Sequence, residues 1–324
     1  MRCARAVSRA EILKMTTTHS SKLDFMLLVL LALLWGSSYG LIKVGIETIP
    51  PATLTAGRIT LAAVILTSVL YMRGMSLPSS PTLWLQLLLQ GVINLVLPFL
   101  LISWGELHVS SGLASILATT APFFAFGIAA LTGHAARGFS QALGLLCGFC
   151  GVVVIVGWQT LSELGGPQFA AQLALIAAGF CYGSSSNYGR VFRRVSPIAV
   201  GAGTLLWAMV LTVPLSLAID HPWTLQPSLR SLGAMLSLGV LSTALAFSIY
   251  FRLLGTLGTV GTSTVGYLRV GFGVVIGILF LGEHLTPASA TGLAFIVLGV
   301  ALINGQLGRV GTILRRRPSS AARS

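Results

Sequence analysis

The sequence predicts an all-α membrane protein with ten transmembrane helices, arranged as two inverted five-helix repeats. Three observations lead to this fold class: the composition, a series of ten long apolar runs, and an internal repeat. The 324 residues are 55% hydrophobic and only 8% charged, with a mean hydropathy of +0.90. Soluble domains carry about 25% charged residues. The charged residues of this chain are therefore too few to solvate the surface of soluble domains.

The position of the basic residues argues against a nucleic-acid binder. The net charge is +13 at pH 7, which could by itself indicate binding to nucleic acid. Most of the bases, however, fall in short segments between apolar runs, as in the cytoplasmic loops of membrane proteins. We therefore expect no nucleic-acid partner.

Ten apolar runs are long enough to cross the hydrocarbon core as helices, which takes about 20 residues each. Charged residues, polar turns or Pro/Gly clusters separate these runs. The first run continues into a full span, so we interpret it as an uncleaved helix rather than a signal peptide. The expected helices are 25–46, 52–72, 83–104, 109–132, 140–158, 169–189, 197–219, 231–251, 258–281 and 287–306.

The charge distribution predicts that both termini are cytoplasmic. When the N-terminus is placed inside, most lysines and arginines fall in inner segments, as the positive-inside rule requires. The exceptions are Lys43, Arg58, Arg230 and Arg269. The acidic residues of the outer segments are Glu47, Glu106, Glu163, Asp220 and Glu283. The expected location is the bacterial plasma membrane, in a multi-pass arrangement.

The second half of the chain repeats the first at an offset of 147 to 149 residues. Residues 35–39 (Trp-Gly-Ser-Ser-Tyr) recur as 182–186 (Tyr-Gly-Ser-Ser-Ser), and 91–94 recur as 239–242. Further matches are Pro50 with Pro197, Gly112 with Gly261, Gly133 with Gly282, Gly144 with Gly292, and Gly151 with Gly299. Each half holds an odd number of spans, so the halves enter the membrane from opposite sides. Inverted repeats of this kind are typical of secondary transporters that work by alternating access.

The repeat divides the chain into two similar units flanked by short tails. The expected parts are an N-terminal cytoplasmic tail (1–24), a first repeat (25–158), a second repeat (169–306) and a basic cytoplasmic C-terminal tail (307–324).

Several motifs carry a resemblance to a known family. They are residues 34–39 (Leu-Trp-Gly-Ser-Ser-Tyr), Pro50-Pro51 followed by Arg58, residues 280–286 (Phe-Leu-Gly-Glu-His-Leu-Thr), and Gly292 followed by residues 298–300 (Leu-Gly-Val). With these motifs the chain resembles the drug/metabolite transporter superfamily, specifically its EamA type, over roughly residues 25–306. Two positions depart from the family pattern: His134 replaces a usual acidic residue, and Val270 replaces a usual proline.

The resemblance implies a ten-helix transporter that moves a small metabolite across the plasma membrane, with efflux as the expected direction. The implied partners are a small-molecule substrate and membrane lipids. Whether the protein forms a homodimer is left undecided by the resemblance. In the family's fold, spans 1, 3, 4, 6, 8 and 9 line a central cavity. Interhelical hydrogen bonding is the competing role for polar residues on these spans. The candidate substrate-binding residues are Trp35, Tyr39, Asn94, Thr119, Thr120, Tyr182, Ser242, Tyr267 and Arg269.

Two arginines lie inside predicted spans, where a charged group is costly and commonly functional. Arg269 falls near the middle of its span and has no carboxylate in any span to pair with. A guanidinium binds a carboxylate through two parallel hydrogen bonds. We therefore predict a cargo with an acid group, such as an amino acid. Arg58 lies closer to a helix end, so a snorkelling side chain is an equally good interpretation, and the resemblance suggests a structural role.

The sequence leaves two alternatives for the coupling of transport to an ion. Proton-driven carriers usually hold an acidic residue within the membrane. Here the nearest is Glu106, at the outer end of the third span. The sequence thus predicts either facilitated diffusion or exchange, or proton coupling through Glu106 alone.

No cofactor, metal site or enzymatic activity is expected. The sequence has no Gly-rich phosphate loop and no His-Glu-x-x-His motif. Cys147 and Cys150 form a Cys-x-x-Cys pattern within an apolar run, where we interpret them as small packing residues. The alternatives to a transporter are a channel or scramblase without alternating access, and a membrane-embedded lipid enzyme. The enzyme would need acids or histidines clustered at one membrane face, which the sequence lacks.

Overall fold

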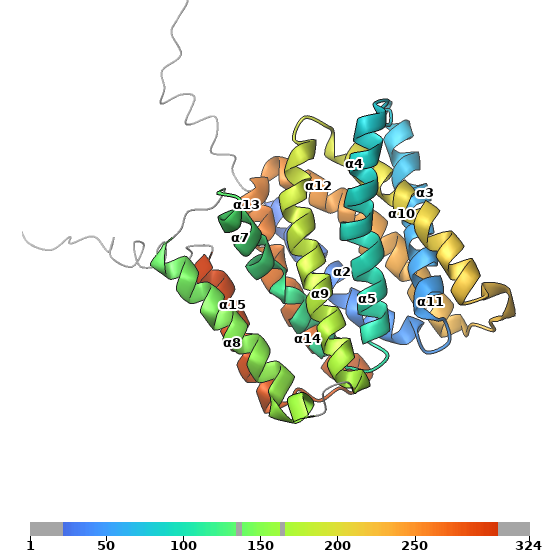
Figure 1. Ribbon diagram of the computed structural model, residues 1–324. Coiled ribbons are helices and arrows are strands. Elements are labelled where there is room, and N and C mark those ends of the chain that lie inside the picture. The colour runs from blue at the N-terminus through green and yellow to red at the C-terminus, as the bar shows by residue number, and fades with distance from the viewer. Residues whose placement is uncertain (1–21, 134–137, 163–165, 304–324) are drawn as a thin grey trace, which may run out of the picture.

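The computed structural model describes residues 22–133, 138–162 and 166–303, and all regular elements within them are helices (Figure 1). The predicted tails lie outside these residues except for 22–24, which form the first turn of the first helix. The first half contains α2 (Lys22–Gly45), α3 (Pro51–Met72), α4 (Pro81–Gly91), η1 (Val92–Val96), α5 (Leu97–Gly105), α6 (Ser111–Leu117), η2 (Ala118–Thr120), α7 (Ala121–Leu131) and α8 (Phe139–Ser162). The second half contains α9 (Pro167–Tyr188), η3 (Gly189–Phe192), α10 (Pro197–Ile219), η4 (Pro222–Thr224), α11 (Leu229–Gly239), η5 (Val240–Leu245), α12 (Ala246–Thr256), α13 (Gly258–Ser263), α14 (Val265–Leu281) and α15 (Pro287–Ile303).

These helices confirm the predicted fold class of ten spans in two five-helix repeats. Seven helical stretches in the described part are at least 18 residues long and apolar enough to cross a membrane. The other three spans are α9, which is long but carries a run of polar residues, and the shorter apolar helices α14 and α15. At 17 residues each, these two reach the lower limit of what a membrane helix needs.

Local sequence signals set the ends of the helices. Five α-helices have proline as their first residue, where the missing N–H costs nothing: α3, α4, α9, α10 and α15. The end of α14 is set by Gly282, which adopts a left-handed conformation with φ of 65°. Glycine alone among the residues takes this conformation without a steric penalty.

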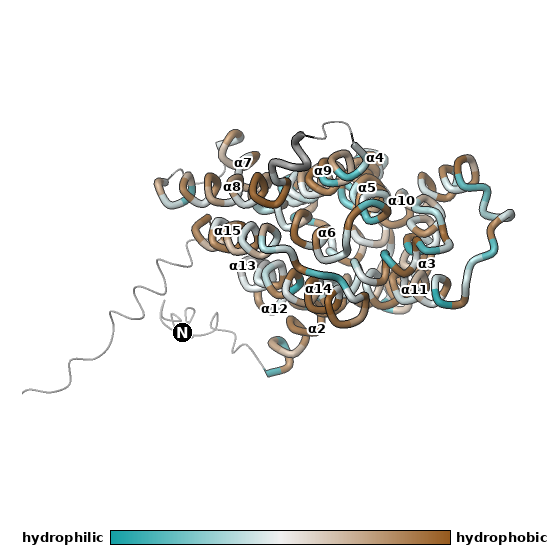
Figure 2. The backbone as a smooth tube through the Cα atoms, turned by 90° about the horizontal axis from the view of Figure 1, so that it is seen from below, coloured by the Kyte–Doolittle hydropathy of each residue, from teal (hydrophilic) through white to brown (hydrophobic). Residues whose placement is uncertain are grey.

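The outer surface of the bundle is hydrophobic, as expected for a protein surrounded by lipid. Figure 2, a view from below Figure 1, shows hydrophobic residues along the peripheral helices as well as the inner ones. Large apolar side chains such as Phe149 on α8 and Phe280 on α14 are more than 60% exposed. A soluble protein does not tolerate contiguous apolar patches of this kind, whereas lipid solvates them.

The two repeats pack against each other through symmetric helix pairs. The main pairs are α8 with α15, α3 with α10, α2 with α14, and α7 with α9. The pairs α8–α15 and α3–α10 lie on opposite sides of the molecule in both views (Figures 1 and 2). The first helix of each half thus packs on the fourth span of the other half, which explains the repeated Gly-Ser-Ser motif. A Cβ on Gly36 would lie 2.6 Å from the backbone oxygen of Arg269, and one on Gly183 would lie 2.7 Å from the backbone nitrogen of Ala125.

Glycines bring α8 and α15 into backbone contact. A Cβ on Gly299 would lie 2.5 Å from the backbone oxygen of Gly144, and one on Gly151 would lie 2.7 Å from that of Gly292. All four glycines belong to the two pairs that match between the repeats, and each contacts a member of the other pair. The crossing itself is therefore symmetric. Close backbone approach through small residues is the main way that helices associate in a membrane.

Each repeat contains one π-helical turn at an equivalent position. In η1 the amide of Leu97 donates to the carbonyl of Val92, and in η5 the amide of Ala246 donates to that of Leu241. Both turns follow the matched Gly-Val dipeptide that the sequence repeat identified. Pro98 lacks an N–H and accounts for the irregularity in the first repeat, whereas the second repeat has no proline there. Such π-turns are frequent at functional sites.

Two predicted spans are broken rather than continuous. The expected helix 109–132 is divided into α6, η2 and α7, and the expected helix 258–281 into α13 and α14. Pro122 accounts for the first break, because the turn before it tightens to a 3-10 helix where the proline N–H is missing. At the second break the amides of Thr264 and Tyr267 bond to carbonyls three residues earlier.

The alternation of the spans places the two ends of the bundle on opposite faces of a membrane. The α3–α4 and α9–α10 connections lie at the upper end of Figure 1, and the start of α9 lies at the lower end. Residues Glu47, Asp220 and Glu283 belong to the lower end, which is called the acidic end below. Arg190 and Arg193 belong to the upper end, which is called the basic end. Glu163, also predicted on the acidic side, lies outside the described residues.

We expect the acidic end to face outward. In intact cells, an impermeant maleimide should label a cysteine at His284 but not one at Arg193, in a variant without the native cysteines. Both side chains are exposed on the protein, so the side of the membrane on which each lies decides whether it is labelled. Labelling of Arg193→Cys from outside would contradict both the charge argument and the predicted orientation.

Candidate functional site

A cavity of about 560 Å³ opens in the half of the bundle nearer the basic end. It is bounded by α7, α9 and α14, together with the start of α8 and the end of α15. The lining residues on α9 begin at Tyr182 and continue past the end of the helix to Arg190. Gln141 in the first turns of α8 and Ile303 at the end of α15 lie at the same end. A cavity of this volume matches the size of small-molecule binding sites.

Arg269 is the central charged residue of the cavity. It lies on α14 one turn from the break after α13, and its side chain is partly buried. The Nε atom is buried and has no hydrogen-bond partner. Among the described residues, no carboxylate forms an ion pair with it. A partly buried guanidinium that lines a cavity without a carboxylate partner can serve as one half of an anion site.

Four of the nine predicted site residues line the cavity together. They are Thr119, Tyr182, Tyr267 and Arg269, from η2, α9 and α14. The phenol of Tyr182 lies close enough to Arg269 for an electrostatic interaction. Tyr39 interacts electrostatically with the same arginine from α2, although it is buried and does not line the cavity. The structure therefore brings one predicted residue of span 4, one of span 6 and two of span 9 to the wall of one cavity.

The other predicted residues lie in helix contacts instead. Trp35 packs against Tyr250 and Phe247 in an aromatic cluster, with ring centroids 5.5 and 6.4 Å away. Thr120 is buried and donates to the carbonyl of Leu117. Asn94 accepts a hydrogen bond from Ser185, 2.8 Å away. Ser242 is buried in η5, and its hydroxyl has no partner in the described structure.

Sequence reasoning missed several polar residues of the cavity: Gln141, Ser186, Asn187 and Arg190. Arg190 was interpreted as a topology signal alone. Asn187 donates to the carbonyls of Ala125 and Gly183, so it also ties α9 to α7. Their spacing in the sequence could have identified them. Along α9 and the turn after it, one face is formed by residues 182, 183, 186, 187 and 190, which recur at helical intervals.

Arg58 does not line the cavity. Its side chain is buried between α3, α5 and η5, where Nε donates to Thr243 Oγ1 at 2.8 Å. The guanidinium lies 3.9 Å from the centroid of the Phe99 ring, in a cation–π arrangement. The structure therefore shows neither a snorkelling side chain nor a cavity residue here. Arg58 joins the π-turn of the second repeat to the first repeat.

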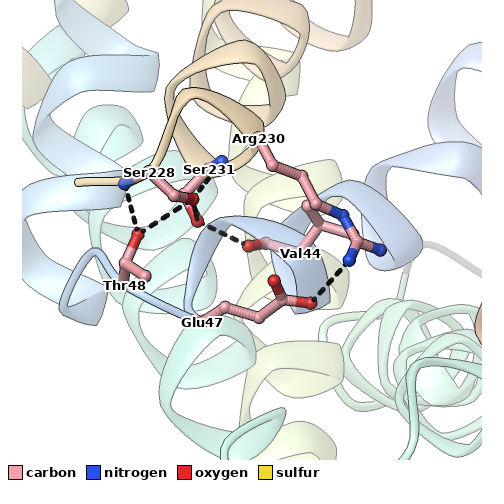
Figure 3. A network of polar contacts seen from close by, with 6 residues as sticks. All are labelled: Val44, Glu47, Thr48, Ser228, Arg230 and Ser231. Carbon is pink, nitrogen blue, oxygen red and sulfur yellow. Dashed lines mark hydrogen bonds and ion pairs between the residues drawn. The ribbon is translucent and has the colours of Figure 1, made fainter.

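The acidic end of the bundle is closed by polar contacts between the two halves (Figure 3). Ser231 donates to the carbonyl of Val44 at 3.0 Å, and the amide of Ser228 donates to Thr48 at 3.1 Å. Arg230 and Glu47 form an exposed ion pair at 3.7 Å. Exposed pairs contribute about 0–1 kcal/mol each, so the closure depends on the sum of these contacts.

A second closure joins the α14–α15 connection to the start of α6. The Glu283 carboxylate accepts hydrogen bonds from the amides of Ser111 and Gly112, at 2.6 and 2.9 Å. Lys43 on α2 donates to the carbonyls of Glu106 and Val109 in the neighbouring α5–α6 connection. The molecule is thus open toward the basic end and closed at the acidic end.

The fold and the cavity define a polytopic helical membrane protein with a cavity toward its basic end. Comparison with known proteins identifies the class further, because the model of the EamA-like transporter family matches residues 23–157 and 169–305. The chain belongs to the EamA-like transporter family. The two matched segments correspond to the two repeats.

The named relatives are bacterial transporters. The chain is 26% identical to the uncharacterized inner membrane transporter YedA of Escherichia coli, over 84% of this chain and 88% of that protein. It is 26% identical to a probable terminal-alkyne amino-acid exporter of Streptantibioticus cattleyicolor, over 90% and 95%. It is 28% identical to the S-adenosylmethionine/S-adenosylhomocysteine transporter of Chlamydia trachomatis, over 89% and 91%.

A solved crystal structure shares the fold. It superimposes with a TM-score of 0.62 at 20% sequence identity, over 88% of this chain and 98% of that chain. The family and its relatives place the chain among multi-pass membrane transporters of small metabolites.

Proposed function

We propose that the protein is a secondary exporter of a small metabolite bearing a carboxylate, and that it works by alternating access across the bacterial plasma membrane. The observation that carries the proposal is Arg269, which lines the cavity and whose buried Nε has no hydrogen-bond partner. A cargo carboxylate completes its hydrogen bonding through a bidentate pair. Arg190 adds a second positive charge to the cavity wall, which contains no acidic residue.

The state of the molecule supports alternating access. The cavity lies toward the basic end, and hydrogen bonds between the halves close the acidic end. In the orientation favoured by the charges, this is an inward-facing state that can load cargo from the cytoplasm. The symmetry between the repeats supplies the second state, because exchanging the conformations of the halves closes the basic end and opens the acidic end.

The names of two relatives agree with an acid-bearing cargo. One is a probable amino-acid exporter, and the other carries S-adenosylmethionine and S-adenosylhomocysteine, which contain an amino-acid group. At 26% and 28% identity these names support the chemical class of the cargo and leave its identity to experiment.

The test is a comparison of exported metabolites. Cells that express the protein and cells with an empty vector would be fed with dipeptides, and the medium would be examined by mass spectrometry. We expect carboxylate-bearing amino acids or their derivatives to accumulate outside the expressing cells. Exclusive accumulation of neutral or cationic compounds would contradict the proposal. Cross-linking α2 to α11 at the acidic end should stop export by a transporter, whereas a scramblase or channel path elsewhere would continue to conduct.

A further inference from the structure

Glu106 is a fully buried acidic residue that the cargo site does not use. It caps α5 at the acidic end, one residue beyond the span Pro81–Gly105. The residue has no exposed surface, and both carboxyl oxygens lack a hydrogen-bond partner. By contrast, Glu283 at the same end binds two amides. Glu106 is therefore buried without the hydrogen bonds that normally stabilise a carboxylate.

An ionised carboxylate in this position is unfavourable. Removing a carboxylate from water costs several kcal/mol unless hydrogen bonds or a close counter-charge offset the loss. Lys43 lies nearby, but its ammonium group donates to the backbone carbonyls of Glu106 and Val109. Among the described residues, no ion pair within 4.0 Å joins Lys43 to the carboxylate. Burial consequently raises the pKa of Glu106 well above its usual range, although Lys43 opposes this shift.

The surroundings of Glu106 contain charges of both signs. Lys43 and Tyr39 face it from α2, Arg58 faces it from α3, and Glu283 faces it from the α14–α15 connection. Helix α9 packs against the neighbouring Gly105 with Leu175 and Ala171, which do not titrate. Lys43 and Arg58 favour the ionised form, whereas Glu283 favours the neutral form together with burial.

The geometry favours a proton over a metal cation as the ligand of this carboxylate. A sodium or calcium ion would need several oxygen ligands around it. The backbone carbonyls beside the carboxylate, those of Glu106 and Val109, are already occupied by the Lys43 ammonium group. A proton needs only one carboxyl oxygen.

We propose that Glu106 is a proton-binding site of the transport cycle, which takes up a proton when the acidic end closes and releases it when that end opens. The inference rests on the proposed function in one respect, because it takes the closed structure to be one state of a transport cycle. In the closed state the carboxyl group is dry and neutral. In the open state water reaches it, and the proton returns to solvent at the pH of that side.

The sign of the pH effect follows from this difference. The closed state has the higher affinity for the proton, so low pH favours closure and rising pH favours opening. Between the proton affinities of the two states, the ratio of open to closed molecules should rise about tenfold per pH unit. The effect ends at high pH once the closed state is also deprotonated, and at low pH once the open state is also protonated.

Distance measurement between spin labels tests the proposal without any cargo. Labels would be attached at His108→Cys and His284→Cys, which are exposed on opposite halves of the acidic end, after replacement of the native cysteines by alanine. The distance distribution would be recorded from pH 5 to pH 10 in lipid nanodiscs by pulsed electron paramagnetic resonance.

We expect a short distance to dominate at low pH and a longer one to grow as the pH rises. Glu106→Gln should keep the short distance at every pH, because its neutral amide replaces the protonated acid. Glu106→Met, of similar size, should behave in the same way if the glutamine variant does not fold. Glu47→Gln is the matched control, because it removes an exposed acid from the same end and should leave the pH response in place.

A pH response that persists unchanged in Glu106→Gln would overturn the proposal, as would a parent protein whose distances do not change with pH. Failure of the carboxylate-cargo proposal is distinguishable, because it would alter the exported compounds and leave the spin-label titration as described.

Discussion

Replacement of Arg269 by glutamine should abolish transport of carboxylate-bearing cargo while leaving the fold intact. Loss of one member of a buried, hydrogen-bonded charge pair costs about 2–5 kcal/mol, which corresponds to ~30-fold to several thousandfold in affinity. The fold should survive because the buried Nε makes no hydrogen bond in the described structure, so no internal contact is lost there. Cargo binding to purified protein and counterflow in proteoliposomes measure the effect.

Two further variants separate charge from geometry. Arg269→Lys keeps the positive charge but loses the planar fork, so we expect weak transport rather than none. Arg252→Gln, an exposed arginine on α12, is the control for removal of a positive charge and should transport like the parent. If Arg269→Gln transports at the parent rate, the residue is only a packing cation, and the argument for an acidic cargo fails.

Leucine in place of Gly299 should prevent the α8–α15 pair from forming and remove most of the folded protein. Even a single Cβ at this position would lie 2.5 Å from the backbone oxygen of Gly144 and 2.8 Å from the nitrogen of Gly148. Overpacking typically costs about 1–3 kcal/mol and more where backbone must move. In lipid the helices also lack a hydrophobic force to hold them together once the packing is lost.

Gly271→Leu is the matched control for this variant. Gly271 lies on α14, is exposed, and has open space where a Cβ would be. The yield of monodisperse protein and its apparent melting temperature should therefore fall for Gly299→Leu and stay near the parent values for Gly271→Leu. Equal yields for the two variants would contradict the role assigned to the glycine crossing.

The sequence predicts the number of spans and the repeat well because both depend on properties that a membrane enforces along the whole chain. Apolar length marks the spans, and matched glycines such as Gly144 and Gly292 mark the helix crossings. The breaks within two spans are harder to anticipate. Pro122 gives a local signal for the first, but the break at Thr264 has no comparable residue, and neither does the π-turn after Gly239.

The cavity is only partly predictable for a different reason. The membrane position of Arg269 is visible in the sequence, whereas the direction in which a polar side chain points depends on how the helices are rotated. Asn94 and Ser242 were equally plausible from the sequence, but the rotation of their helices turns Asn94 toward Ser185 of α9 and buries Ser242 away from the cavity. Arg190 appeared to be a loop charge until the packing of α9 placed it on the cavity wall.

The π-turn of the first repeat allows a single span to present different faces to two neighbours. Before the turn, Leu87 and Gly91 of α4 meet Gly203 and Thr204 of α10, whereas after it Gly105 of α5 meets α9. One extra residue in a turn rotates the rest of a helix by about 100°. The azimuth of each segment is therefore set by a different partner, α10 for the segment before residues 92–96 and α9 for the segment after them.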